Sequence, residues 1–137
     1  MAEKETENKS RLNRHRGDFK WHGIKTRRYK LQGGDWAHVI RRVIIGHKGE
    51  SAKFHLRYFE ISPGGYTSLE KHRHEHVVIC VRGKGKVRTE NKMNTMNYLD
   101  TLYIAPLAPH QLRNPYDEPF GFFCIVNARR DKPRPLK

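Results

Sequence analysis

Histidine and glutamate side chains are concentrated in one short stretch, residues 70 to 76, which reads EKHRHEH. A further histidine, His110, follows much later in the phrase APLAPHQLRN. Imidazole nitrogens combined with a carboxylate oxygen bind Zn²⁺, Fe²⁺, Mn²⁺, Ni²⁺ or Cu²⁺, whereas an all-oxygen set suits Ca²⁺ or Mg²⁺. These residue types therefore predict a site for one divalent transition metal ion, without specifying which one.

Strand geometry alone leaves the choice of ligands open. Side chains alternate along a β-strand, so Glu70, His72 and His74 would share one face if the strand continued through them. Geometry alone does not decide between Glu70 and His74.

The stretch from Pro63 to Asn114 resembles the two-motif core of the cupin superfamily, whose first motif is written G-x5-H-x-H-x3-4-E-x6-G. Two registers compete. With the motif's HxH placed on His72 and His74, Val78 falls where the third ligand belongs. With it placed on Glu70 and His72, every interval fits, because the sequence then reads Gly64, five residues, Glu70, one, His72, three, His76, six, Gly83.

We prefer the second register because it needs no deletion in the strand that follows. The second motif, G-x5-P-x-G-x2-H-x3-N, maps with all its intervals intact, although only its His and Asn match in identity; its positions are Leu99, Ala105, Leu107, His110 and Asn114. The resemblance implies that the metal is held by four side chains in a permuted order: Glu70, His72, His76 and His110.

The resemblance also implies a function. A six-coordinate ion with four protein ligands keeps positions for a small molecule, so we expect a dioxygenase, isomerase or lyase that acts on an anionic, chelating substrate. His74 and Glu75 are the candidates for a general base beside that substrate. The alternative is a non-catalytic ligand-binding or sensing module.

Short strands must position these residues. Runs of β-branched and aromatic residues bounded by Gly, Pro, Asn or Asp predict strands, and no segment shows a convincing helical period. The predicted strands cover residues 37–45, 54–61, 77–81, 85–89, 100–105 and 120–126, with turns at 46–49 and 63–65. We therefore expect an all-β fold, the double-stranded β-helix or jelly-roll barrel of the cupins.

Composition sets the domain organisation. The chain has 137 residues, enough for one domain, and the barrel is expected over residues 21–137. Residues 1–20 are polar and charge-dense, so they are expected to form a disordered or loosely attached basic arm. Two cysteines, Cys80 and Cys124, lie in apolar runs and are expected to be buried free thiols.

The formal net charge of +14 favours anionic partners. Basic residues interleaved with aromatics in the first thirty positions allow nucleic-acid binding as a less favoured alternative, since no recognition motif is present. Neither a signal peptide nor a membrane segment is expected, which predicts a cytoplasmic protein. The exposed sheet edges of an unclosed barrel predict a homodimer.

Overall fold

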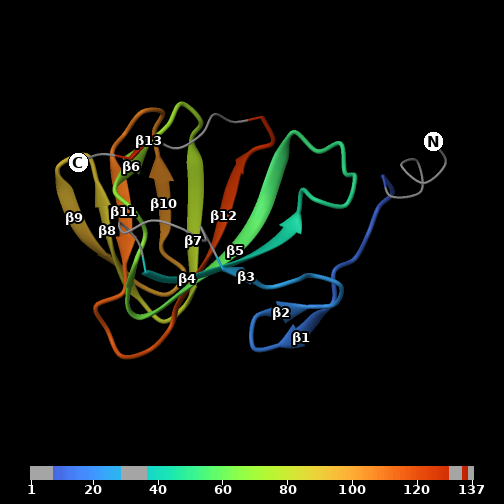
Figure 1. Ribbon diagram of the computed structural model, residues 1–137, viewed down its shortest axis with the longest axis horizontal. Helices are drawn as coiled ribbons and strands as arrows, with labels where there is room; N and C mark the ends of the chain where they lie inside the picture. Colours follow the sequence, from blue (N-terminus) through green and yellow to red (C-terminus); the bar gives the residue numbers. More distant parts are fainter. Residues whose placement is uncertain (1–7, 29–36, 130–133, 136–137) are drawn as a thin grey trace.

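The computed structural model describes residues 8–28, 37–129 and 134–135, and the regular secondary structure of these residues is entirely β (Figure 1). No helix in these ranges is long and apolar enough to cross a membrane. The strands are β1 (His15–Gly17), β2 (Lys20–Trp21), β3 (Arg27–Arg28), β4 (Ala37–Ile45), β5 (Phe54–Tyr66), β6 (Glu70–Lys71), β7 (His76–Arg82), β8 (Gly85–Thr89), β9 (Lys92–Met96), β10 (Thr101–Ile104), β11 (His110–Arg113), β12 (Phe120–Asn127) and β13 (Arg134–Pro135).

Two layers of antiparallel strands enclose the interior. One layer pairs β10 with β7, β7 with β12, β12 with β5 and β5 with β4. The other pairs β9 with β8 and β8 with β11, and β11 also pairs with β6. The result is the predicted all-β jelly-roll barrel of the cupin type.

Strand β5 joins the two layers. Its first part pairs with β4 and β12, and its last residue, Tyr66, pairs with Arg113 of β11. The bend between these parts lies at Gly64, whose φ of 82° is unfavourable for residues with a side chain. The sequence predicted that residues 63–65 end the strand; instead the strand bends there and continues in the second layer, as strands do at the corners of barrels.

Asn114 stabilises this bend through hydrogen bonds from its side chain. Its side-chain Nδ2 donates to the carbonyl oxygens of Ile61 and Glu118 at 2.8 and 2.7 Å, and the residue is 1% exposed. The last residue of the second motif therefore has a structural role, holding the loop before β12 against β5.

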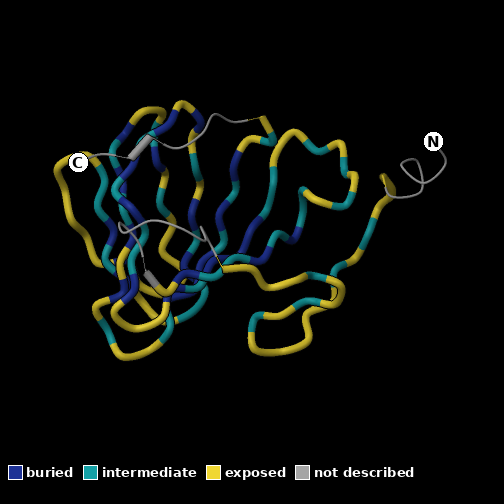
Figure 2. The backbone as a smooth tube through the Cα atoms, viewed as in Figure 1, coloured by how far each residue is buried: buried dark blue, intermediate teal, exposed yellow. Residues whose placement is uncertain are grey.

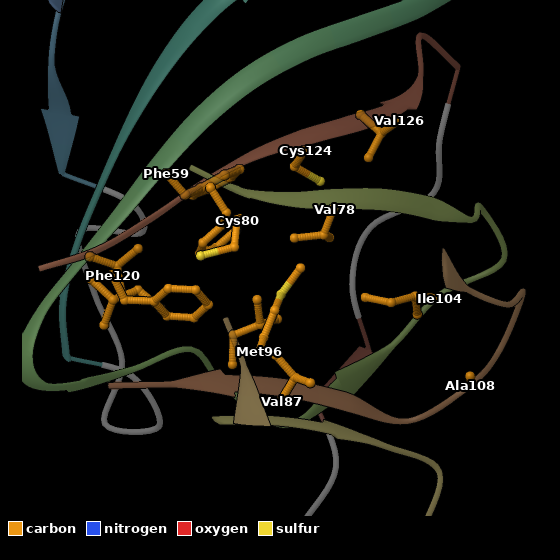
Figure 3. Packing of buried hydrophobic residues seen from close by; sticks show 14 residues of the cluster. Phe59, Val78, Cys80, Val87, Met96, Ile104, Ala108, Phe120, Cys124 and Val126 are labelled. Atoms are coloured by element: carbon orange, nitrogen blue, oxygen red, sulfur yellow. The ribbon is translucent and has the colours of Figure 1, made fainter. Parts of the chain in front are cut away.

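The apolar core fills the space between the layers. Figure 3 shows side chains from the two layers pointing toward one another, with Phe59, Val78 and Cys124 on one side and Val87 and Met96 on the other. The strands of the barrel carry most of the buried positions, whereas the β1–β2 hairpin is largely exposed (Figure 2). Both cysteines are buried and free, as predicted.

The second half of the predicted loose arm is ordered against the barrel. Residues 15–21 form the β1–β2 hairpin, and the ring of Phe19 stacks on Tyr58 with centroids 5.3 Å apart. Arg11 forms an ion pair with Glu50. The hairpin was not predicted because its few apolar residues are buried by contact with β5, which lies far away in the sequence.

The other predicted strands lie close to those of the structure. The range 37–45 is reproduced by β4, and 85–89 by β8; β7, β10 and β12 differ by a residue or so at each end. Strands β9 and β11 were not predicted, since KMNTM and HQLR have neither the alternation nor the β-branched content of a typical strand.

Candidate metal centre

Three histidines from different parts of the fold converge inside the barrel. His72 lies in the short loop after β6, His76 is the first residue of β7, and His110 is the first residue of β11. One ring nitrogen from each can be chosen so that all three lie within 4.8 Å of one another. Small rotations suffice to bring such nitrogens to the roughly 2.1 Å that a bound transition metal requires.

The second nitrogen of each ring is already bonded. Nδ1 of His72 lies 3.1 Å from the carbonyl oxygen of His74, and Nδ1 of His110 lies 2.9 Å from that of Ala108. Since a carbonyl oxygen only accepts, both Nδ1 atoms carry the proton, which leaves each Nε2 as a free electron-pair donor. Partners of this kind orient metal-binding histidines.

Both ring nitrogens of His76 have a partner. Its Nδ1 lies 3.1 Å from Sγ of Cys124, and its Nε2 lies 2.9 Å from Nε2 of His72. Two facing Nε2 atoms at this separation suit two ligands on one ion. The donor set therefore fits a divalent transition metal.

Burial keeps the imidazoles of His72 and His76 neutral. Burial, reinforced by the neighbouring His74 and His110, lowers the pKa of His72 from 6.5 to about 4. Burial also lowers the pKa of His76 to about 2, and His72, His110 and Arg57 act in the same direction. Neutral imidazole is the form that binds a cation, so no proton needs to leave at neutral pH.

Glu70 lies next to this cluster on the adjacent strand. It pairs with His110 across β6 and β11, so the two side chains project from the same face, and it is 6% exposed. Its carboxylate accepts a hydrogen bond from Ser68 Oγ at 2.5 Å. Glu70 lines the adjoining cavity, but among the described residues the donor atoms that lie within 4.8 Å of one another belong to the three histidines, so its role as fourth ligand stays a prediction.

The two predicted general bases are placed differently. The ring of His74 stacks on that of His72 with centroids 3.7 Å apart, and it is 9% exposed. The exposed Glu75 accepts a hydrogen bond from the hydroxyl of Tyr103 at the surface. Neither residue lines the cavity described next. Strand β6 ends at Lys71, so the strand alternation that would place Glu70, His72 and His74 on one face does not continue through them.

A small cavity of about 50 Å³ lies beside the histidines. Its polar lining includes Glu70, His76 and His110, and its apolar wall includes Phe122. Two other aromatic residues lie away from the cavity: Tyr58 packs against Phe19 outside the barrel, and Tyr103 is 59% exposed.

The backbone of the second motif has the geometry expected of the glycines that it lacks. Leu99 and Leu107 occupy the two positions where the second cupin motif has glycine, and they have φ angles of 68° and 62°. Such angles are uncommon for leucine and ordinary for glycine. At Gly83, the last glycine of the first motif, a Cβ atom would lie 2.2 Å from the carbonyl oxygen of Pro119. The turn geometry of the second motif is thus retained although leucine replaces both of its glycines.

Two further residues line the cavity and were not predicted from the sequence. Arg57 and Cys124 are cross-strand neighbours on β5 and β12, and both line the cavity. A signal for Arg57 was present, because period-two alternation places it on the same face as Phe59 and Ile61. Nothing in the sequence indicated that Cys124 lies against a histidine.

Comparison with known proteins agrees with the fold. Residues 57–126 match the family model Cupin_2, described as a cupin domain. The chain is 37% identical over 117 residues to the 1-methylthio-D-xylulose 5-phosphate methylsulfurylase of Rhodospirillum rubrum, covering 85% of this chain and 74% of that protein.

Solved structures show the same likeness. A cupin-2 domain protein from Rhodospirillum rubrum superposes with a TM-score of 0.80 at 33% identity, covering 92% of this chain and 84% of that one. A cupin 2 conserved barrel domain protein from Rhodopseudomonas palustris superposes with a TM-score of 0.85 at 30% identity, covering 93% and 87%.

Proposed function

Since this chain belongs to the cupin domain family, we propose that it is a metal-dependent enzyme that acts on a small anionic molecule, with a phosphorylated sugar as the first substrate class to test. The observation that carries the proposal is the convergence of His72, His76 and His110 beside a buried cavity. Several neutral nitrogen donors that converge on one point form an arrangement that suits a bound metal ion.

In this proposal the metal is held by Glu70, His72, His76 and His110. A divalent ion bound there supplies Lewis-acid polarisation of a coordinated oxygen, and a redox-active ion also supplies electron-transfer chemistry. The protein residues fix the ion, exclude bulk water by burial and orient the ligand. The hydrogen bonds from Nδ1 of His72 and His110 to backbone carbonyls restrict ring rotation, which prepares the site before a metal arrives.

The substrate class rests on charge and on a relative. The chain has a formal net charge of +14, which raises the local concentration of anions. The methylsulfurylase of Rhodospirillum rubrum is named for a phosphorylated methylthio sugar, a small anionic molecule. We therefore take 1-methylthio-D-xylulose 5-phosphate as the first compound for assay.

The test begins with elemental analysis of protein purified without a histidine tag. The metal-free protein is then reloaded separately with Mn²⁺, Fe²⁺, Zn²⁺ or Ni²⁺, and consumption of 1-methylthio-D-xylulose 5-phosphate is followed by phosphorus NMR. We expect binding of about one equivalent of metal and metal-dependent turnover that is lost in His110→Ala. The exposed His47 provides the matched control, His47→Ala, which should retain both properties.

Two results would contradict the proposal separately. Absence of tight metal binding would remove the metal centre. Tight metal binding, with compounds of this class bound but not converted, would indicate the non-catalytic binding module instead. The homodimer predicted from the sequence stays a prediction, which light scattering can check.

A further inference from the structure

Arg57 is a buried cation without a counter-ion. It is 6% exposed, its side chain lines the cavity, and it forms no ion pair with any carboxylate in the described ranges. Among the described residues, its Nη2 donates only to Sγ of Cys124, at 3.5 Å, and its buried Nε has no hydrogen-bond partner. A buried guanidinium with an unused donor is costly, because the desolvation of its charge is not compensated.

The surroundings of Arg57 do not provide the missing compensation. Its Cζ lies 4.9 Å from the ring centroid of Phe59, a contact that offsets part of the desolvation cost. The titratable groups that share its cavity are the imidazoles of His76 and His110, the Cys124 thiol and the single carboxylate of Glu70. Because Glu70 is also assigned to the metal in the proposed function, one dication and one guanidinium face a single negative charge. The cavity is thus left with excess positive charge.

We propose that Arg57 is the anion-binding residue of this cavity, holding the negatively charged oxygens of the substrate beside the metal. The inference rests on the proposed function and adds to it a residue and a ligand chemistry. The guanidinium presents its N–H donors in a planar fork that matches the two oxygens of a carboxylate, an enediolate or a phosphate. An anion bound there satisfies the unused donor and neutralises the excess charge in one step.

The position of Arg57 in the barrel suits this role. It lies on β5 directly opposite Cys124 of β12, and Cys124 in turn contacts Nδ1 of His76. Arg57 is therefore one side chain removed from a predicted metal ligand. A ligand with two neighbouring oxygens can reach the ion and the guanidinium together, which fixes its orientation as well as its charge.

Two anions test the inference on the metal-loaded protein, with binding measured by isothermal titration calorimetry. Oxalate represents carboxylate and enediolate oxygens, and inorganic phosphate represents the phosphate group. We expect Arg57→Met to weaken binding of at least one of them by about tenfold or more, and Arg57→Lys to weaken it less, because lysine keeps the charge but loses the fork. The anion more strongly affected identifies the group that Arg57 holds.

Arg42 offers the matched control. It is another buried arginine with an unpartnered nitrogen, but it lies opposite Tyr58 on the outer side of the sheet, where its Nε donates to Thr26. Arg42→Met should leave anion binding unchanged. A fall in anion affinity as large in Arg42→Met as in Arg57→Met would overturn the inference, since it would reflect general charge rather than a subsite.

Stability provides a second readout. Replacing an uncompensated buried cation with an apolar side chain of similar length is expected to preserve or raise the melting temperature, with metal content unchanged. Unfolding of Arg57→Met would show that the arginine is structural and would overturn the inference. So would unchanged binding of both anions, while metal binding and the proposed function would stand. If the wild type binds no metal, loss of anion binding in Arg57→Met alone would still support the subsite.

Discussion

The two faces of strand β5 both carry charged and aromatic residues. On the outer face the charged groups are paired with one another, and on the inner face, within the part of the chain that the structure describes, they are not. On the outer face, Tyr58 donates to Glu60 at 2.8 Å, Arg82 forms an ion pair with Glu60 at 2.9 Å, and Phe19 covers Tyr58. On the inner face, Arg57 lies beside Phe59 and Cys124 with no carboxylate partner in the described ranges.

The difference separates stability from function. The outer cluster is internally compensated, so it needs nothing further and attaches the N-terminal hairpin to the barrel. The inner face has neutral imidazoles, a lone buried cation and unused donor atoms, an arrangement that costs stability unless a ligand completes it. Uncompensated polar groups inside an otherwise apolar barrel therefore indicate the position of the functional site.

The largest expected effect comes from removing one histidine of the inner cluster. His110→Ala should weaken metal binding by more than about 100-fold, because losing a ligand costs more than losing the hydrogen-bond partner of a ligand. Competition with a chelator of known affinity measures the change. The outer-face variant Tyr58→Phe serves as the comparison, and equal metal affinity in the two variants would break the proposed division between the faces.

The next effect distinguishes the fourth ligand. Glu70→Gln should weaken metal binding by about 100-fold, whereas His74→Ala should do so by less than about tenfold, because His74 stacks on His72 without lining the cavity. The same chelator competition ranks the two variants. The reverse order would identify His74 as the ligand and restore the first motif register.

The pH dependence of the metal-free protein provides a third test of the inner face. The folded-state pKa of His72 is about 4, below the ordinary value of 6.5. As pH falls from about 6.5 toward about 4, the unfolded chain takes up a proton on this imidazole and the folded chain does not, so the free energy of unfolding should decrease. Urea midpoints across this window measure the decrease. A slope in His72→Gln as steep as in the wild type would contradict the assignment.

The smallest effect is expected on the outer face. Tyr58→Phe removes the hydroxyl that donates to Glu60 and should cost about 1–2 kcal/mol of unfolding free energy, as for a hydrogen bond to a charged group. Burial, aided by Glu60, raises the pKa of Tyr58, so its proton stays on throughout the ordinary pH range. Denaturant unfolding measures the loss, and a change in metal content of this variant would show that the two faces are coupled.

Local patterns were enough for much of the fold. Alternating β-branched and aromatic residues predicted β4 and β8 with their bounds, because a half-buried strand needs that pattern whatever it pairs with. The hairpin of residues 15–21 was missed because its aromatic rings pack on Tyr58 of β5, which lies far away in the sequence. Strand β9 was missed although its partner β8 is its neighbour along the chain, because KMNTM is mostly exposed and lacks the alternation of a half-buried strand.

The sequence by itself determined the donor types that the candidate site offers: its histidines and carboxylate, at intervals that fit the cupin motifs, are ligands that suit a transition metal ion. Only the tertiary structure decided which of these side chains meet and what faces them. The loop after β6 turns His72 toward His76, and the pairing of β5 with β12 brings Arg57 and Cys124 to the same cavity. Ligand type is a property of single residues, whereas convergence and uncompensated charge arise from strands paired across long stretches of chain.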